Sequence, residues 1–498
     1  MAWCGLDFTI VRVGPDPKST EEAQKSKLMC FGQLRKGYSV LLPCDVQRQE
    51  FLRTPLTIPC PIAAFREDAL QVAFGEQHWA VLTSDGKLWT AGYNAFGQLG
   101  RGMYSDTGFS ALGKVRFFET RVSTSVACGR NHTLVVVQYT AARTGGSQEV
   151  WGCGSNADHQ LSAEVFGTSC NFIALDISNL TGHKHENVVM PGVPVRIAGG
   201  SDFSVVSVGD AVGMIGTGYP RVQDSEYGDL NSPVGFKIPA DSVAELPWQG
   251  APIKHLVAGG EHVLIGCVCD RRLRVFCWGY PGSGQVVTKP TEVVYDCPLQ
   301  TSNEFPSMLA TTSGNSLIMV SGTVWTLGGE LHPLRWPPSV SPSATDMPTV
   351  IDPQSFDHRP VAYVGCGPRH AVFVTTCGRL FVRGHCSWRN QFFPKARDNC
   401  LPTGFRSTKQ GVIAICEHEP LALPLEVPAE LLCNLPCGVV CIALARKLAF
   451  LMGTHARLRV KDVAGGYSTG FDTAQLDSLV LKMILDACDA QLPQLLRA

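Results

Sequence analysis

The chain is patterned as short runs of strand-forming residues separated by glycine-rich turns. The clearest unit spans residues 72–102, where two such runs flank Asp85 and Gly86. An Asp-Gly pair between two strand-like runs is a strong signal for a β-hairpin. Further turn chemistry follows at residues 97–100, which read Gly-Gln-Leu-Gly. The unit therefore predicts a small antiparallel sheet.

The same unit recurs along the rest of the chain, although the later copies keep fewer of its characteristic residues. Its copies align on one turn position, occupied by Gly75, Gly129, Gly200, Gly259, Thr312, Gly367 and Gly438. The intervals exceed the roughly 40 to 50 residues of a propeller blade, and surface loops accommodate such an excess. The longest extra segments, residues 219–250, 332–360 and 387–428, are rich in Pro and turn residues and are expected to be loops. The fold class expected is all-β, a seven-bladed β-propeller.

The two ends of the chain lie outside the clear repeats. We expect an N-terminal segment at residues 1–27, a propeller at residues 28–453 and a C-terminal tail at residues 454–498. The fragment at residues 28–34 resembles the end of a unit, so either the N-terminal part or residues 446–453 is expected to close the ring. Closure removes the exposed sheet edges that invite aggregation.

The tail predicts a short amphipathic helix. Asp472 and Thr473 offer a capping side chain, and apolar residues then recur along one face. Such a face needs cover, either from the propeller or from a partner.

Composition and charge narrow the classes of partner. The net charge is −1 and the pI about 6.9, so no global field attracts nucleic acid or anionic lipid. Residues 1–27 mix basic and acidic side chains and form no basic tail for chromatin. The chain shows no secretory signal, and its longest apolar run, residues 437–445, is far too short to span a membrane. An intracellular location, cytoplasmic or nuclear, and no membrane partner are expected.

Neither a cofactor nor a catalytic motif is indicated. The 20 cysteines contain no pair with the two-residue spacing of zinc sites. Cys128 and Cys366 stand just before a repeat glycine, where a small buried thiol packs well. The sequence lacks a phosphate-binding loop and a zinc-protease helix motif. We therefore expect no metal, no cofactor and no catalytic residue.

Taken together, Gly-x-x-His, a strand, Asp-Gly, a strand ending in Trp-x-x-Gly, and Gly-Gln-Leu-Gly resemble the repeat of the regulator of chromosome condensation family. The resemblance covers roughly residues 28–453 and is most specific in the first copy. It implies a seven-bladed propeller. It also implies one of two activities, because some members exchange nucleotide on the small GTPase Ran and others are protein-binding modules.

The same resemblance singles out candidate partner-binding residues. Asp202 matches the acidic residue of the third repeat, and His78 matches the histidine of the first. Three positions depart from the family pattern: Arg130 replaces an acidic residue, and Asn315 and Cys441 replace histidines. The resemblance therefore supports the propeller fold more strongly than it supports the exchange activity.

Histidines recur at one position of the repeat, at His78, His132, His262 and His370. Their spacing around a propeller is too wide for one metal site. Two roles remain open for them and for Asp202: hydrogen bonding within the blades, or contact with a partner.

The leading hypothesis is a non-catalytic scaffold or regulator, a propeller module that binds a protein partner. The alternative is a guanine nucleotide exchange factor for a Ran-like small GTPase. Chromatin binding is a third and weaker hypothesis, because the chain lacks a basic tail.

Overall fold

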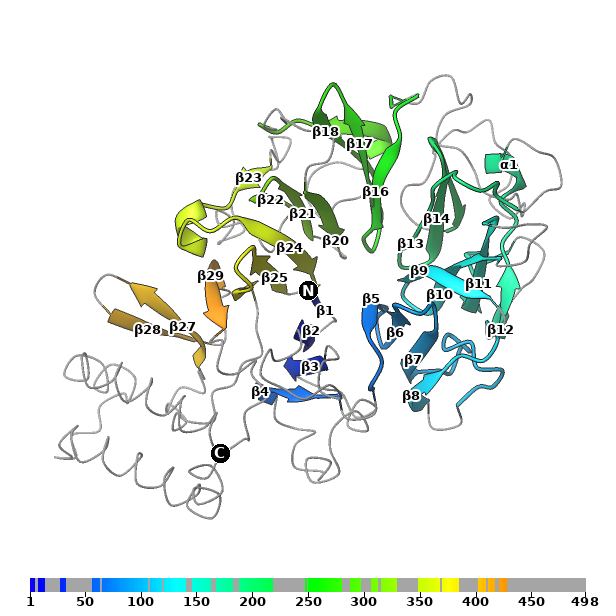
Figure 1. The fold of residues 1–498 in the computed structure, drawn as a ribbon, viewed down its shortest axis with the longest axis horizontal. Coiled ribbons are helices and arrows are strands. Elements are labelled where there is room, and N and C mark those ends of the chain that lie inside the picture. Colours follow the sequence, from blue (N-terminus) through cyan, green and yellow to red (C-terminus); the bar gives the residue numbers. More distant parts are fainter. Residues whose placement is uncertain are drawn as a thin grey trace, which may run out of the picture.

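The computed structural model describes residues 1–4, 8–13, 27–32, 56–62, 65–105, 108–118, 121–139, 146–162, 167–181, 188–217, 247–248, 250–279, 287–296, 306–311, 315–328, 348–367, 370–384, 402–408, 411–416 and 421–427. The described strands form a ring of seven sheets, the blades of a β-propeller, with the N-terminus near its centre (Figure 1). In each blade the first strand lies innermost, and consecutive strands pair antiparallel toward the rim. The all-β, seven-bladed prediction is confirmed, whereas the expected C-terminal helix lies outside the described residues.

The strands follow one another around the ring in chain order. Blade 1 contains β1 (Ala2–Cys4), β2 (Phe8–Val13), β3 (Lys27–Gly32) and β4 (Leu56–Pro61). Blade 2 contains β5 (Ala69–Phe74), β6 (His78–Thr83), β7 (Leu88–Tyr93) and β8 (Phe109–Lys114), and blade 3 contains β9 (Val122–Cys128), β10 (His132–Gln138), β11 (Gln148–Asn156) and β12 (Gly167–Ala174). Blade 4 contains β13 (Val195–Gly199), β14 (Phe203–Val208) and β15 (Ala211–Gly216), preceded by the short helix α1 (Ser178–Thr181).

The remaining blades close the circle. Blade 5 contains β16 (Ile253–Ala258), β17 (His262–Cys269), β18 (Arg272–Gly279) and β19 (Val287–Val293), and blade 6 contains β20 (Ser307–Thr311), β21 (Asn315–Val320), β22 (Thr323–Gly328) and β23 (Thr349–Val350). Blade 7 follows the 3₁₀ helix η5 (Pro353–Phe356) and contains β24 (Val361–Cys366), β25 (His370–Thr375), β26 (Leu380–Gly384) and β29 (Leu421–Val427). A separate hairpin, β27 (Pro402–Thr408) and β28 (Gly411–Cys416), precedes β29.

The start of the chain differs from expectation. Residues 1–27 were expected to precede the propeller, yet they supply β1 and β2 of blade 1. The apolar side chains of Ile10 and Val11 are buried, which explains why this segment joins a sheet. The described part of this fragment, residues 28–32, therefore belongs to the first blade and does not complete the last one.

The last blade also differs from expectation. Its fourth strand, β29, pairs with β26 and comes from the segment at residues 387–428 that was expected to be a loop. The seventh repeat copy expected around Gly438, and the alternative closing strand at residues 446–453, lie outside the described residues.

The second strand of most blades is buried on both faces because each blade is packed between two neighbours. All six residues of β6 and of β14 are buried. Such strands read as continuous apolar runs rather than alternating ones. Inner strands are partly exposed, and β5, β16 and β24 each carry an irregularity in register near their first residue.

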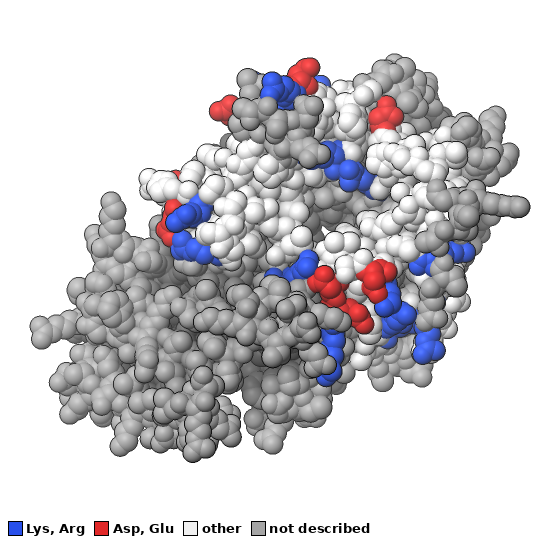
Figure 2. Space-filling model, in the orientation of Figure 1, with Lys and Arg blue, Asp and Glu red and all other residues white. Residues whose placement is uncertain are grey.

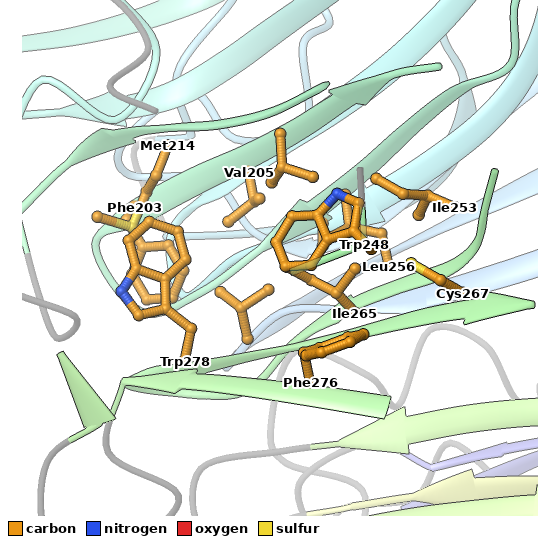
Figure 3. Packing of buried hydrophobic residues seen from close by; sticks show 13 residues of the cluster. Phe203, Val205, Met214, Trp248, Ile253, Leu256, Ile265, Cys267, Phe276 and Trp278 are labelled. Carbon is orange, nitrogen blue, oxygen red and sulfur yellow. The ribbon is translucent and has the colours of Figure 1, made fainter. Parts of the chain in front are cut away.

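Hydrophobic layers lie between consecutive blades and form the core. Figure 3 shows the layer between blades 4 and 5, where Phe203 and Met214 face Trp278. Trp248 lies in the same layer 5.3 Å from the Phe276 ring and donates its indole N–H to the carbonyl of Asp210. Burial of such aromatic area is the main stabilising contribution between blades.

The ring closes where blade 1 meets blade 7. β1 contacts β24 and β25, and the rings of Trp3 and Tyr363 pack edge to face at 6.1 Å. The glycine at 365 lets β24 approach, because a Cβ atom there would lie 2.9 Å from the carbonyl oxygen of Ala2. Among the described strands, none belongs to both blades, so this seam is held by packing and side-chain bonds. No helix in the described ranges has the length and apolar character needed to cross a membrane.

Candidate protein-interaction site

The four repeat histidines lie inside the propeller. His78, His132 and His262 are fully buried, and His370 is 4% exposed. Each begins the second strand of its blade, at the mouth of the loop that follows the innermost strand. A partner does not reach these rings in this arrangement, so their placement fits the hydrogen-bonding role and gives no support to partner contact.

Each of these histidines is hydrogen bonded to a hydroxyl group of the next blade. The Nε2-to-hydroxyl distances are 2.9 Å for His78 to Thr133, 3.1 Å for His132 to Ser204, 2.9 Å for His262 to Ser316 and 2.9 Å for His370 to Thr9. The last of these bonds crosses the seam and joins residues 361 positions apart.

The hydroxyl also fixes the histidine tautomer in two blades. Thr133 donates its hydroxyl hydrogen to the carbonyl of Gln98 at 2.7 Å, and Ser204 donates to the carbonyl of Gln160 at 2.6 Å. Each hydroxyl then accepts the Nε2–H of the histidine, because one O–H group has a single hydrogen to give. The next blade is therefore held by both the histidine and the Gln-Leu turn of the preceding one.

The glycine three residues before each of two histidines makes room for the ring. A Cβ atom on Gly75 would lie 2.3 Å from Cε1 of His78, and one on Gly129 would lie 2.0 Å from Cε1 of His132. No side chain fits at these distances. The Gly-x-x-His pattern is thus a packing requirement at the junction between blades.

The other three junctions lack both members of the pair. Their histidine positions hold Phe8, Phe203 and Asn315, and the residues aligned with the hydroxyl in the next blade are Trp79, Val263 and Ala371. Histidine and hydroxyl therefore occur together or not at all. Sequence comparison between adjacent repeats contains this signal, which reading each copy alone does not reveal.

Burial keeps three of these imidazoles neutral. It lowers the pKa of His78 to about 3 and the pKa values of His132 and His262 to about 4. An uncharged donor matches an uncharged hydroxyl acceptor in a dry site.

Asp202, the remaining candidate, lies at the surface on the loop between β13 and β14. That loop is joined by backbone hydrogen bonds to the equivalent loops of its neighbours: Glu76 N to Arg130 O at 3.2 Å, Arg130 N to Gly200 O at 3.1 Å, and Ser201 N to Gly260 O at 2.9 Å. Four consecutive blades thereby present one continuous arc of loops.

Charged side chains gather on this arc. Arg130 lies 3.2 Å from a carboxylate oxygen of Glu76 and 3.5 Å from one of Asp202. Burial raises the pKa of Asp202, Arg130 opposes this, and the carboxylates of Asp158, Glu76 and Glu261 raise it further. We call these five residues the loop-face cluster, which has four carboxylates and one guanidinium, with two of the carboxylates paired to the guanidinium.

Sequence reasoning identified only part of this cluster. It singled out Asp202 and treated Arg130 as a departure from the family pattern, whereas the structure shows Arg130 bridging two acids. Glu76, Asp158 and Glu261 were missed. The signal for Glu76 and Glu261 was their place between the repeat glycine and the histidine, and nothing local marks Asp158.

The opposite signs of charge are also mixed elsewhere. On the face shown in Figure 2, Lys and Arg side chains lie beside Asp and Glu side chains, and most of the described surface is uncharged. In the parts of the chain that the structure describes, no group of three or more His, Cys, Asp or Glu side chains is arranged to hold a metal ion.

Comparison with known proteins agrees with this architecture. Models of the regulator of chromosome condensation (RCC1) repeat match residues 85–136 and 70–98. The RCC1-like G exchanging factor-like protein of Mus musculus is 28% identical over 289 residues, which cover 56% of this chain and 54% of that protein. Human Protein RCC2 is 28% identical over 229 residues, which cover 42% of this chain and 39% of that protein.

The chain thus spans about half or less of the length of these two relatives. Among solved structures, that of Prp20p from Saccharomyces cerevisiae superposes with a TM-score of 0.53 at 14% identity, covering 80% of this chain and 85% of Prp20p. This likeness concerns the fold. The chain thus carries the regulator of chromosome condensation repeat at residues 70–136 and is similar to propeller proteins built from that repeat.

Proposed function

We propose that this chain is a protein-interaction module, a non-catalytic scaffold or regulator whose partner binds the loop-face cluster. The observation that carries the proposal is the arc of four loops joined by backbone hydrogen bonds, which holds Glu76, Asp202 and Glu261 on one rigid surface. Rigid presentation lowers the entropy lost on binding. We place this activity inside the cell, in the cytoplasm or nucleus.

The charge of the cluster indicates the chemistry of the partner. Arg130 neutralises only part of four carboxylates, so a partner that brings Lys or Arg side chains gains electrostatic complementarity. Burial raises the pKa of Asp202, and the neighbouring carboxylates raise it further against the effect of Arg130, which means that its charged form is under-compensated in the unbound chain.

The alternative is an exchange factor for a Ran-like GTPase, which grips its partner through the same kind of acidic loop. The support for it is Asp202 on the arc and the name of the mouse relative. Exchange adds a kinetic activity to binding, so binding and nucleotide release must be measured separately.

The test combines an affinity pull-down with a nucleotide-release assay on the full chain. The Asp202→Asn variant removes one charge of the cluster while keeping the shape of the side chain. Its matched control is Asp270→Asn, which removes an exposed carboxylate from the β17–β18 turn, at the other end of blade 5 from Glu261. We expect a specific partner whose binding weakens about tenfold or more with Asp202→Asn and stays unchanged with the control.

Release of labelled GDP from a Ran-like GTPase separates the two hypotheses. The module hypothesis expects no acceleration by the wild-type chain. Acceleration that is lost with Asp202→Asn would establish the exchange factor instead. If Asp202→Asn and Asp270→Asn both bind the partner as strongly as the wild type does, the loop-face cluster is not the partner site.

A further inference from the structure

A second surface lies at the other end of β9 from the loop-face cluster. Arg130 follows β9, whereas Arg121 precedes it, and a seven-residue strand separates the two by roughly 20 Å. At the Arg121 end, side chains from two blades form what we call the aromatic patch: Arg116, Phe117, Arg121, Tyr139 and Trp151.

The patch is built around Arg121. Its guanidinium carbon lies 5.1 Å from the ring centroid of Tyr139 and 5.0 Å from that of Trp151. A single carboxylate oxygen of Glu149 accepts hydrogen bonds from the Tyr139 hydroxyl at 2.8 Å and from the Trp151 indole at 2.9 Å. The two rings are thereby fixed, and the arginine is held between them.

Phe117 extends the patch to the surface. Its ring lies 5.3 Å from that of Trp151 and 5.9 Å from that of Phe172, yet the residue remains 41% exposed. Arg116, its neighbour in the chain, is exposed as well. An aromatic ring that rests on a packed cluster and still faces solvent is typical of binding hot spots.

The two arginines of the patch form no ion pair within it. Among the described residues, no carboxylate lies within ion-pair distance of Arg116 or Arg121. One terminal nitrogen of Arg121 is also buried without a hydrogen-bond partner. The carboxylate of Glu149 is already used to orient the two rings. Arg116 and Arg121 are therefore left without a carboxylate at ion-pair distance among the described residues, beside the exposed ring of Phe117.

We propose that the aromatic patch docks an acidic peptide segment that carries one apolar side chain. The apolar side chain packs on Phe117, and the carboxylates flanking it lie in the field of Arg116 and Arg121. The chain would then bind two partners of opposite charge at the two ends of one strand, which goes beyond the function proposed above.

A peptide fits the patch better than a single-stranded nucleic acid. Nucleic acid binding of that kind relies on several ring faces that are free to stack with successive bases. Here Tyr139 and Trp151 each have a face against Arg121, which leaves Phe117 as the exposed ring of the patch. One exposed ring suits one apolar side chain.

The test is fluorescence anisotropy on the full chain with three labelled probes. The first is a peptide with one Phe flanked by Asp and Glu residues, the second has Lys in place of the acids, and the third is an oligothymidylate. We expect saturable binding of the acidic peptide only. Phe117→Ala and Arg116→Glu should each weaken it by about tenfold.

Control variants change one exposed apolar residue and one exposed arginine elsewhere. Val350→Ala shortens an apolar side chain that is 50% exposed, and Arg272→Glu reverses an exposed charge. Both should bind the acidic peptide like the wild type. Asp202→Asn should as well, which keeps this proposal separate from the one for the loop-face cluster.

Three results would overturn the proposal: no saturable binding of the acidic peptide, binding that survives both patch variants, or binding of the oligothymidylate in its place. Arg116 makes none of the described ring contacts, so Arg116→Glu remains informative even if Phe117→Ala disturbs folding.

Discussion

At the scale of single residues, His78 and His132 act as neutral hydrogen-bond donors between blades. Their burial and low pKa values leave them uncharged at neutral pH. What the family pattern marks as a candidate binding residue is here a part of the core. Asp202 differs because it lies on the surface among other charges.

We expect Thr133→Val to destabilise the fold by about 1 to 3 kcal/mol, because it leaves the Nε2–H of His78 unpaired and leaves the carbonyl of Gln98 with only the weak thiol donor of Cys153. His78→Phe added to Thr133→Val imitates the natural combination of Phe203 and Val263 and should cost less than the sum of the two single changes. Urea denaturation of the four proteins measures this coupling, and strict additivity would argue against a paired junction.

Stability should also fall with pH below neutrality. An unfolded histidine has a pKa of about 6.5, whereas folded His78 has one of about 3 and folded His132 one of about 4. The unfolded state therefore binds more protons between these values, and stability is complete above about pH 6.5 and lost as pH falls toward 4. Near pH 5 each such histidine should cost up to about 2 kcal/mol.

Urea denaturation at neutral pH and near pH 5 tests this. The variant with both His78→Phe and Thr133→Val should lose less stability on acidification than the wild type does. An unchanged difference between the two pH values would show that His78 contributes nothing to the pH dependence.

The ion pairs of the loop-face cluster illustrate the limit of sequence reasoning at this scale. Arg130 contacts residues from two other blades, 54 positions before it and 72 after it. Aligning the repeats shows that these loops meet, but the direction in which each side chain points depends on the loop geometry.

At the scale of elements, the Asp-Gly hairpin was readable from sequence because its turn chemistry is local. Gly86 has a φ of 77°, and Thr83 accepts and donates hydrogen bonds with the backbone of Lys87 across the turn. Blade 7 repeats this arrangement with Gly378 at a φ of 83° and with Thr375 bonded to Arg379.

Comparing these two turns separates the cost of a positive φ at a non-glycine residue from the cost of a steric clash of its Cβ atom. A Cβ atom on Gly86 would lie 2.5 Å from Cγ1 of Val122 in blade 3, whereas one on Gly378 would meet nothing within 4 Å. We expect Gly378→Ala to cost about 1 kcal/mol from its positive φ, and Gly86→Ala to cost clearly more. Thermal denaturation of both variants checks this, and equal losses would mean that Val122 yields without cost.

The elements that sequence reasoning misplaced lack such local signals. Blade 1 has Phe8 at the histidine position, and its strands β2 and β3 are joined by 13 residues without a tight Asp-Gly turn. In blade 7, β29 pairs with β26 across a long insertion. Strand pairing between segments so far apart in the chain produces no repeating pattern in the sequence that would reveal it. Seven blades were predicted, and the first six repeat copies correspond to blades 2 to 7, whereas blade 1 was not recognised as a complete unit.

At the scale of the whole molecule, the seam between blades 1 and 7 is the junction that no described strand bridges. His370 and Thr9 form its hydrogen bond, and Trp3 and Tyr363 form its aromatic contact. All other consecutive blades follow each other directly in the chain.

We expect Thr9→Val to raise hydrogen exchange mainly in β1, β2, β24 and β25, because it removes the hydroxyl from this seam. Thr133→Val removes the same kind of bond at an internal junction, so its effect should be smaller and should not spread to the seam. Mass spectrometry of deuterated peptides measures both. Similar exchange profiles for the two variants would show that the seam is no weaker than an internal junction.

The pairing of histidine with hydroxyl has a consequence for folding. Blades that resemble one another risk docking in the wrong order while the chain collapses. The blade bearing His132 finds an acceptor on blade 4, whose second strand begins with Phe203 and Ser204, but none on blade 5, whose second strand begins with His262 and Val263. A junction with a histidine thus penalises a shuffled neighbour that lacks the hydroxyl, so the circular sequence of the blades is partly encoded in single hydroxyl groups.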